Sequence, residues 1–190
     1  MKTTLLALLC LLVLATPQLA EAQIQAFDFL GQVDLPAAVG NDLAMYSVVR
    51  DGSPSVIPPF AMDFDNFEYT LVVSGLTLVI DGGQQSYSNG TIALYEDNGS
   101  SADYTNLATF TDGTAILTGV VTTLTRTVSA LPFPPFTAVS VNGTVDWTGG
   151  TRIDDFAPAD QLNWSFLAGG NTDAADIEPG FDEQWDGKVE

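Results

Sequence analysis

The densest group of oxygen ligands in the sequence is the segment Asp63-Phe64-Asp65-Asn66-Phe67-Glu68. In an extended chain Asp63 and Asp65 point to one side, and carboxylate oxygens suit a hard cation such as calcium. The spacing differs from an EF-hand loop, which requires a glycine and a distal glutamate. We therefore predict a calcium site with Asp63, Asp65 and Glu68 as ligands. The competing interpretation is a solvated polar edge, and a second acidic group that could hold calcium is formed by Asp173, Asp176 and Glu178.

A pair of carboxylates could also hydrolyse glycosides, with one acting as acid and the other as nucleophile or base. The three tryptophans could provide stacking platforms for sugars. However, Trp147 and Trp164 are in phase with the apolar residues Val145 and Phe166, which predicts that both pack in the core. Trp185 has charged neighbours, so we predict that it is exposed and is the aromatic residue available to a ligand.

Other catalytic chemistry lacks its residue types. The chain has no His, and its single cysteine, Cys10, lies near the start. A Ser-based triad needs His or a substituting Lys. After residue 22 the sole lysine is Lys188, close to the end of the sequence. We therefore expect no catalytic residues and no cofactor other than calcium. With 24 acidic residues against 5 basic ones, a net charge of -19 excludes nucleic acid as a partner.

The first 22 residues have the organisation of a signal peptide. A positive start at Lys2 precedes an apolar run, and Ala20-Glu21-Ala22 places small residues where signal peptidase requires them. We predict cleavage after Ala22, and an uncleaved anchor is the alternative. No apolar run of about 18 residues follows, so we expect no stable membrane insertion after cleavage. The predicted product is a secreted or periplasmic single domain over residues 23–190.

Period-2 alternation, typical of strands with one buried face, recurs along this domain. It is clearest over residues 67–80, where Gly75 marks a one-residue change of phase that a β-bulge would accommodate. A Thr-rich strand is predicted over residues 115–128 with Val120 in phase with Ile116 and Leu124, and a continuous strand is predicted through Asn142-Gly143. Further strands are predicted over residues 24–30, 44–49, 92–95, 106–110, 162–167 and 181–189.

About nine or ten short strands without an amphipathic helix predict a single all-β domain. We expect an antiparallel β-sandwich, with a jelly-roll-like form or a small barrel as variants. A transmembrane barrel is the competitor, but it would show lipid-facing alternation in every strand, and the Pro-Pro-Phe segments at 58–60 and 134–136 interrupt that pattern.

Four Asn-X-Ser/Thr sequons begin at Asn89, Asn98, Asn142 and Asn163. They matter only in a glycosylating eukaryote, and two of them lie inside predicted strands, so chance occurrence is the default interpretation. The sequence as a whole predicts a noncatalytic surface, matrix, adhesion or ligand-binding module, with carbohydrate or another surface protein as its partner. The alternative is a carboxylate-based carbohydrate-active enzyme.

Overall fold

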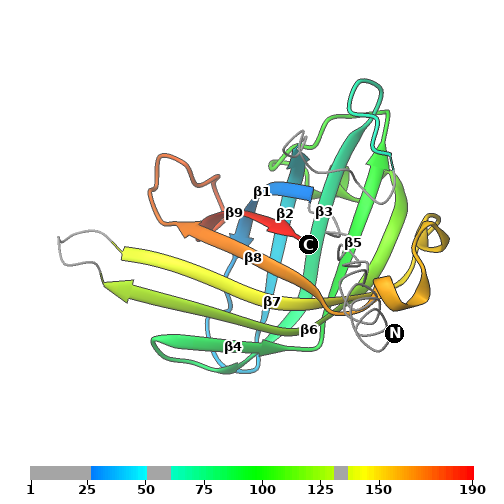
Figure 1. Ribbon diagram of the computed structural model, residues 1–190. Helices are drawn as coiled ribbons and strands as arrows, with labels where there is room; N and C mark the ends of the chain where they lie inside the picture. Colours follow the sequence, from blue (N-terminus) through cyan, green and yellow to red (C-terminus); the bar gives the residue numbers. More distant parts are fainter. Residues whose placement is uncertain (1–26, 51–60, 131–136) are drawn as a thin grey trace, which may run out of the picture.

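The computed structural model describes residues 27–50, 61–130 and 137–190. Nearly all of the regular structure in these residues is β, as predicted, and three short 3-10 helices complete it (Figure 1). The strands are β1 Phe27–Asp34, β2 Asp42–Arg50, β3 Glu68–Ile80, β4 Gln84–Ser88, β5 Gly90–Asp97, β6 Thr114–Ala130, β7 Thr137–Gly149, β8 Trp164–Asn171 and β9 Glu183–Val189. The 3-10 helices are η1 Leu107–Phe110, η2 Ile153–Asp155 and η3 Pro158–Gln161.

The strands form one antiparallel sheet that closes on itself. Strands that follow one another along the chain are paired, except that β4 and β5 each pair with β3 and β6 instead of with each other. β1 pairs with β9 from Phe27↔Val189 to Val33↔Glu183. The result is a closed eight-stranded barrel with β4 as an additional strand. The predicted sandwich is not confirmed, and the barrel variant is observed. Pairing of the first strand with the last leaves neither with a free edge, which is how closed barrels avoid edge-to-edge association.

β4 and β5 both lie between β3 and β6. They are separated by Asn89 alone, which has a positive φ of 65°. The chain therefore bends at this one residue between the two segments. Asn tolerates the left-handed conformation better than most residues, so the bend needs no glycine at this position.

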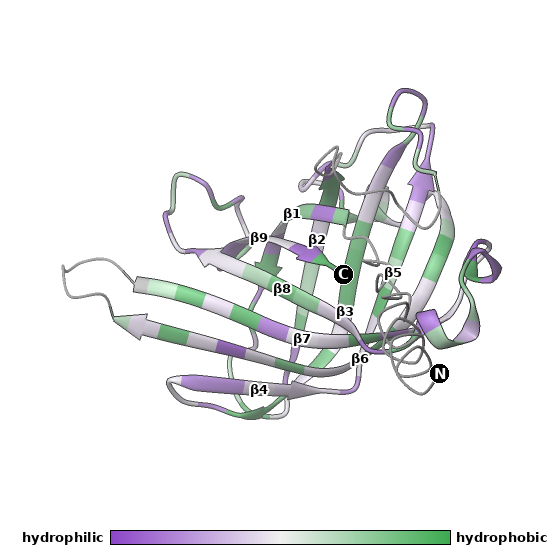
Figure 2. Cartoon of the chain, in the orientation of Figure 1, coloured by the Kyte–Doolittle hydropathy of each residue, from purple (hydrophilic) through white to green (hydrophobic). Residues whose placement is uncertain are grey.

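The barrel is filled by apolar side chains that alternate with polar ones along the strands. Figure 2 shows this alternation along β6 and β7. All three tryptophans are buried, which confirms the prediction for Trp147 and Trp164. Gly90, Ile92 and Leu94 share the inward face of β5, as their spacing indicates.

Bulges adjust the phase of the long strands β3 and β6. β3 is continuous through Gly75, which has a φ of 67°, and its pairing with β2 shifts between Leu43 and Met45, so the predicted bulge is confirmed. The register of β6 shifts once against β5 and twice against β7, and Leu117, Val121 and Leu124 face the core. The prediction for Val120 was wrong: a strict period does not anticipate bulges, and Val120 is 39% exposed.

Two long connections cover the outside of β1, β2 and β3. The connection from β5 to β6 contains η1, where a strand was wrongly predicted over residues 106–110. Tyr104 and Phe110 of this connection pack with Tyr46 of β2 and with Phe181, which precedes β9, at ring centroid distances of 4.8 to 6.3 Å. These four aromatic side chains thus form a second, smaller aromatic cluster on the outer face of the strands.

Several predictions lie outside the described residues. These are the signal peptide of residues 1–22, Cys10 within it, the start of the first predicted strand, and the two Pro-Pro-Phe segments. Within the described ranges, no helix has the length and apolar character needed to cross a membrane.

Candidate functional site

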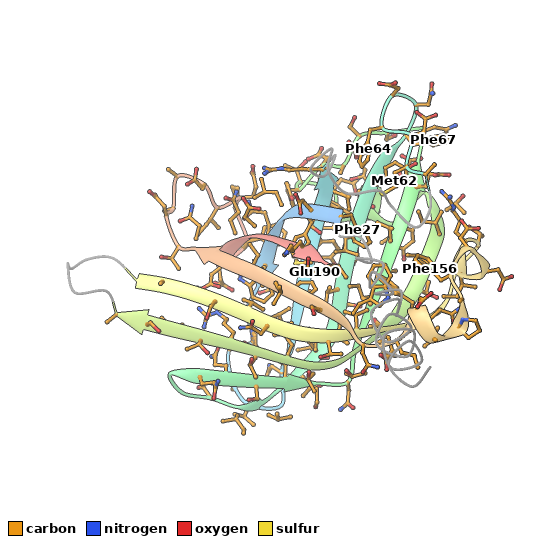
Figure 3. All side chains as sticks on the ribbon, in the orientation of Figure 1. Phe27, Met62, Phe64, Phe67, Phe156 and Glu190 are labelled. Carbon is orange, nitrogen blue, oxygen red and sulfur yellow. The ribbon has the colours of Figure 1, made fainter. Side chains whose placement is uncertain are left out.

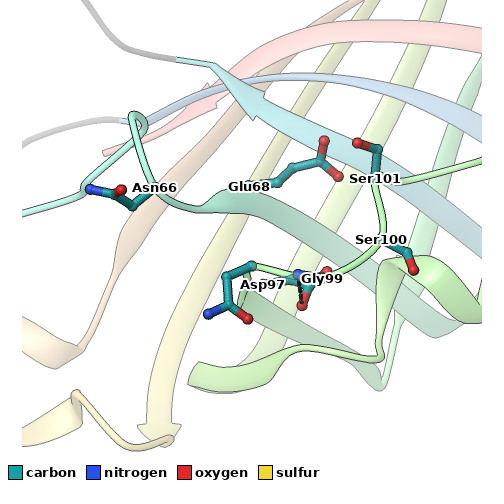
Figure 4. Close-up of a pocket in the computed structure, with 7 residues that line it drawn as sticks. Asn66, Glu68, Asp97, Gly99, Ser100 and Ser101 are labelled. Carbon is teal, nitrogen blue, oxygen red and sulfur yellow. Dashed lines mark hydrogen bonds between the residues drawn. The ribbon is translucent and has the colours of Figure 1, made fainter.

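An open pocket of about 180 Å³ lies where β3 begins and β5 ends (Figure 4). Antiparallel pairing places Glu68 directly opposite Asp97, and the turn after β5 completes the lining. The lining residues are Asn66, Glu68, Asp97, Asn98, Gly99, Ser100 and Ser101. The side chains among them are carboxylates, amides and hydroxyls, so the pocket is suited to a polar ligand.

One oxygen of each carboxylate is used by the pocket's own backbone. Glu68 Oε1 accepts a hydrogen bond from the Ala102 amide at 2.6 Å, and Asp97 Oδ1 accepts one from the Gly99 amide at 3.0 Å, drawn dashed in Figure 4. These bonds hold both carboxylates in place, and among the described residues the second oxygen of each accepts no hydrogen bond. Opposed side chains on paired strands have Cβ atoms about 5 Å apart, and like charges there are destabilising. A donor or cation between the two carboxylates would relieve that repulsion.

The three predicted calcium ligands do not gather at one point. Among the described residues, no group of three His, Cys, Asp or Glu side chains is placed to hold a metal ion. Glu68 lines the pocket, whereas the exposed Asp63 accepts a hydrogen bond from Asn66, and Asp65 is exposed. In the second acidic group, the Asp173 carboxylate likewise accepts a hydrogen bond from within its own segment, from the Ala175 amide. Calcium binding stays a prediction.

The intervening aromatic residues anchor this turn to the barrel. Phe64 and Phe67 lie at the end of the barrel where β3 begins (Figure 3), and both pack on Tyr69. The Tyr69 hydroxyl donates to Glu96 at 2.8 Å and accepts from the Asp63 amide at 2.9 Å. This agrees with the competing interpretation of the segment as a polar edge beside aromatic anchors.

The prediction that Trp185 is exposed was wrong, because none of its surface is accessible. Its charged neighbours misled the interpretation, since Gln184 and Asp186 occupy the outward positions of β9 while Glu183 and Trp185 face inward. The indole packs on Phe166, and its Nε1 donates to Glu183 at 2.9 Å. Trp185 is therefore a core residue that orients a buried carboxylate.

That carboxylate belongs to a charged network inside the barrel, which we call the interior network: Gln85, Tyr87, Arg126, Glu183 and Trp185. Arg126 donates to both oxygens of Glu183, with the Nε to Oε2 distance at 3.0 Å, and its third nitrogen donates to Gln85 at 2.8 Å. The Tyr87 hydroxyl donates to the same Gln85 oxygen at 2.9 Å. The side chains of the ion pair are 9% and 2% exposed. A bidentate pair with its remaining groups satisfied is the arrangement a buried charge requires.

For both Arg126 and Tyr87, burial and the neighbouring charge shift the pKa in opposite directions. Burial disfavours the charge on Arg126, but the hydrogen bonds and charge of Glu183 outweigh it, so the pKa of Arg126 is raised above its usual range. Burial raises the pKa of Tyr87 to about 12, although the Arg126 charge opposes that shift. Burial likewise raises the pKa values of Tyr69 and Tyr104 to about 12.

The raised pKa values of these three tyrosines predict that the protein loses stability at alkaline pH. A phenol with a folded pKa near 12 and an unfolded pKa near 10 stabilises the fold fully below pH 10 and loses that contribution between pH 10 and 12. We expect the urea midpoint to fall over this range, and phenolate absorbance to show delayed ionisation. In Tyr87→Phe the urea midpoint should fall less over this pH range than in the wild type, because one of the three phenols is absent. An equal fall in both proteins would contradict the assignment.

The chain matches no protein-family model, no curated protein and no solved structure.

Sequence reasoning identified Glu68 but missed both its partner and the interior network. Asp97 is 29 residues away along the chain, and only the register of β3 with β5 brings the two together. For the network a weak signal existed: Arg126 is in phase with Leu124 and Val128, and Glu183 is in phase with Trp185. Two opposite charges on inward positions of predicted strands indicate a buried ion pair.

Proposed function

We propose that this chain is an exported, noncatalytic β-barrel module that binds a small polar ligand in the pocket between Glu68 and Asp97. The observation that carries the proposal is the lining of that pocket, with two opposed carboxylates beside amides and hydroxyls. The barrel interior supports it indirectly, since the aromatic and aliphatic core side chains fill the axis. A ligand of the outer pocket needs no opening of that core.

The chemistry of the pocket restricts the ligand class. Ionised carboxylates only accept hydrogen bonds, so the ligand must donate them or carry positive charge. The hydroxyls of a neutral carbohydrate and a calcium ion both meet this condition. An anionic ligand would be repelled by the two carboxylates and by the net charge of -19.

The test is a screen of neutral glycans and calcium against the wild-type chain, followed by matched variants. We expect Glu68→Gln and Asp97→Asn each to weaken binding about tenfold or more, because each removes a charged acceptor worth about 1.5–3 kcal/mol. The control is Asp34→Asn, which removes the same charge from an exposed position at the other end of the barrel and should leave affinity unchanged. Equal weakening in Asp97→Asn and Asp34→Asn would show that general charge, not the pocket, attracts the ligand.

A carboxylate-based glycoside hydrolase is the second candidate. The observation in its favour is the cross-strand pair itself, because two carboxyl groups in one pocket are the catalytic residues that such enzymes require. The same variants decide between the two functions. Turnover of a glycoside that is lost in Glu68→Gln and retained in Asp34→Asn would replace the binding module with the enzyme.

A further inference from the structure

The outer wall of the barrel differs between its two halves. Over β1, β2 and β3 it is covered by the aromatic cluster described above. The part of β4, β6, β7 and β8 away from Asp146 presents an uncharged, mostly polar surface that we call the hydroxyl wall. Two cross-strand rows define it, namely Gln84, Thr127, Ser140 and Gly169, and Ser86, Thr125, Asn142 and Leu167. The 24 acidic residues of the chain contribute none of these positions.

The hydroxyls of the wall are partly satisfied by the sheet itself. Thr125 donates to the Asn142 carbonyl at 3.3 Å, and Thr122 donates to the Thr144 carbonyl at 3.2 Å. The Asn142 side chain is exposed and, within the described residues, its amide makes no hydrogen bond. Asn142 thus presents a free amide nitrogen near the centre of the wall.

This geometry changes the interpretation of the sequons. Four of the eight Asn residues begin one, although only about one residue in six is Ser or Thr. The objection that some lie in strands does not hold, because strand side chains alternate and Asn142 is on the outward face, opposite Thr125 and Leu167. All four sequon Asn side chains, at 89, 98, 142 and 163, are exposed.

We propose that these four asparagines carry N-linked glycans and that the glycan on Asn142 covers the hydroxyl wall. In the reaction the amide nitrogen bonds to C1 of a lipid-diphosphate-linked oligosaccharide, the bond from C1 to the diphosphate oxygen breaks, and the amide loses one proton. The lipid diphosphate is the leaving group. The proposal rests on the export part of the proposed function, because the donor and its transferase are in the secretory pathway. It does not depend on the ligand of the pocket.

A glycan at Asn142 has a structural consequence. It would occupy the uncharged part of the surface, where charge repulsion does the least to prevent two copies from approaching. The glycosylated wall would remain solvated, while acidic residues protect the remaining surface.

The test is expression of the full chain in a eukaryotic secretory host, with intact mass and peptide mapping before and after treatment with an amidase that releases N-glycans. We expect Asn142→Gln and Thr144→Val to lose the same single glycan. Thr144→Ser, which preserves the sequon, should keep it, as should Asn41→Gln, which removes an exposed Asn outside any sequon. Thr144→Val leaves Asn142 in place, so the result does not depend on one variant folding.

Two outcomes would overturn the proposal. One is a chain with unmodified mass, either in the medium or retained in the cell with its full N-terminus. The other is glycans at positions 89, 98 or 163 but never at 142, which would leave the wall uncovered. Neither outcome affects ligand binding by Glu68 and Asp97, which is measured on unglycosylated protein, so failure here is distinguishable from failure of the pocket.

Discussion

Replacing Glu183 by Ala is expected to lower the free energy of unfolding by about 3–5 kcal/mol, because it leaves the Arg126 guanidinium charged and unpaired inside the barrel. The same change removes the acceptor of the Trp185 Nε1 hydrogen. Urea unfolding followed by tryptophan fluorescence measures the effect directly, since all three tryptophans are buried.

Two controls separate burial from charge. Asp186→Ala breaks the exposed ion pair with Arg50, whose side chains are 70% and 51% accessible, and should cost less than about 1 kcal/mol. The double variant Arg126→Met with Glu183→Leu removes both charges, and should cost much less than Glu183→Ala alone. If Glu183→Ala cost no more than Asp186→Ala, the interior network would not be the buried pair described.

Replacing Trp185 by Ala is expected to cost about 3–5 kcal/mol, because it opens a cavity in a packed core. The register places this indole between Gly31 of β1 and Gly170 of β8. An added Cβ at Gly31 would lie 2.6 Å from Ser47 Cβ, and one at Gly170 would lie 2.6 Å from Val139 Cγ1, so both glycines are closely packed. The surrounding strands cannot easily collapse into the space left by the indole.

The comparison for this prediction is Ile80→Ala, at a position 58% exposed, which should change stability by about 0.5 kcal/mol or less. Trp185→Phe should lie between the two. An exposed Trp185, as its charged neighbours suggested, would behave like Ile80. Equal small effects of the two Ala variants would therefore restore the original prediction.

Much of the wall of the barrel was predictable because strand alternation is a local property. The bulge at Gly75, the continuous strand through Asn142-Gly143 and the burial of Trp147 and Trp164 all follow from residues within a few positions of each other. The wrong predictions concern residues whose conformation or orientation is set by contacts with distant parts of the chain. Val120 faces outward because bulges in β6 are set by pairing with β5 and β7, and residues 107–110 are a 3-10 helix packed over β2 and β3.

For the candidate site, the sequence predicted the type of residue involved but not which residues come together. The acidic residues around Glu68 indicated a calcium site, but the predicted partners Asp63 and Asp65 were its neighbours in sequence. The structure pairs Glu68 with Asp97 instead, because opposed positions on two strands are closer than successive residues that point away from each other.

The sequence by itself determined the all-β class, the inward face of most strands and the polar, acidic surface, because each depends on side-chain type and a two-residue period. Only the tertiary structure decided that the sheet closes between β1 and β9, that Arg126 meets Glu183 inside it, and that Asp97 faces Glu68. Each of these depends on register between segments far apart in the chain. Register is a property of paired strands, and no single strand's sequence contains it.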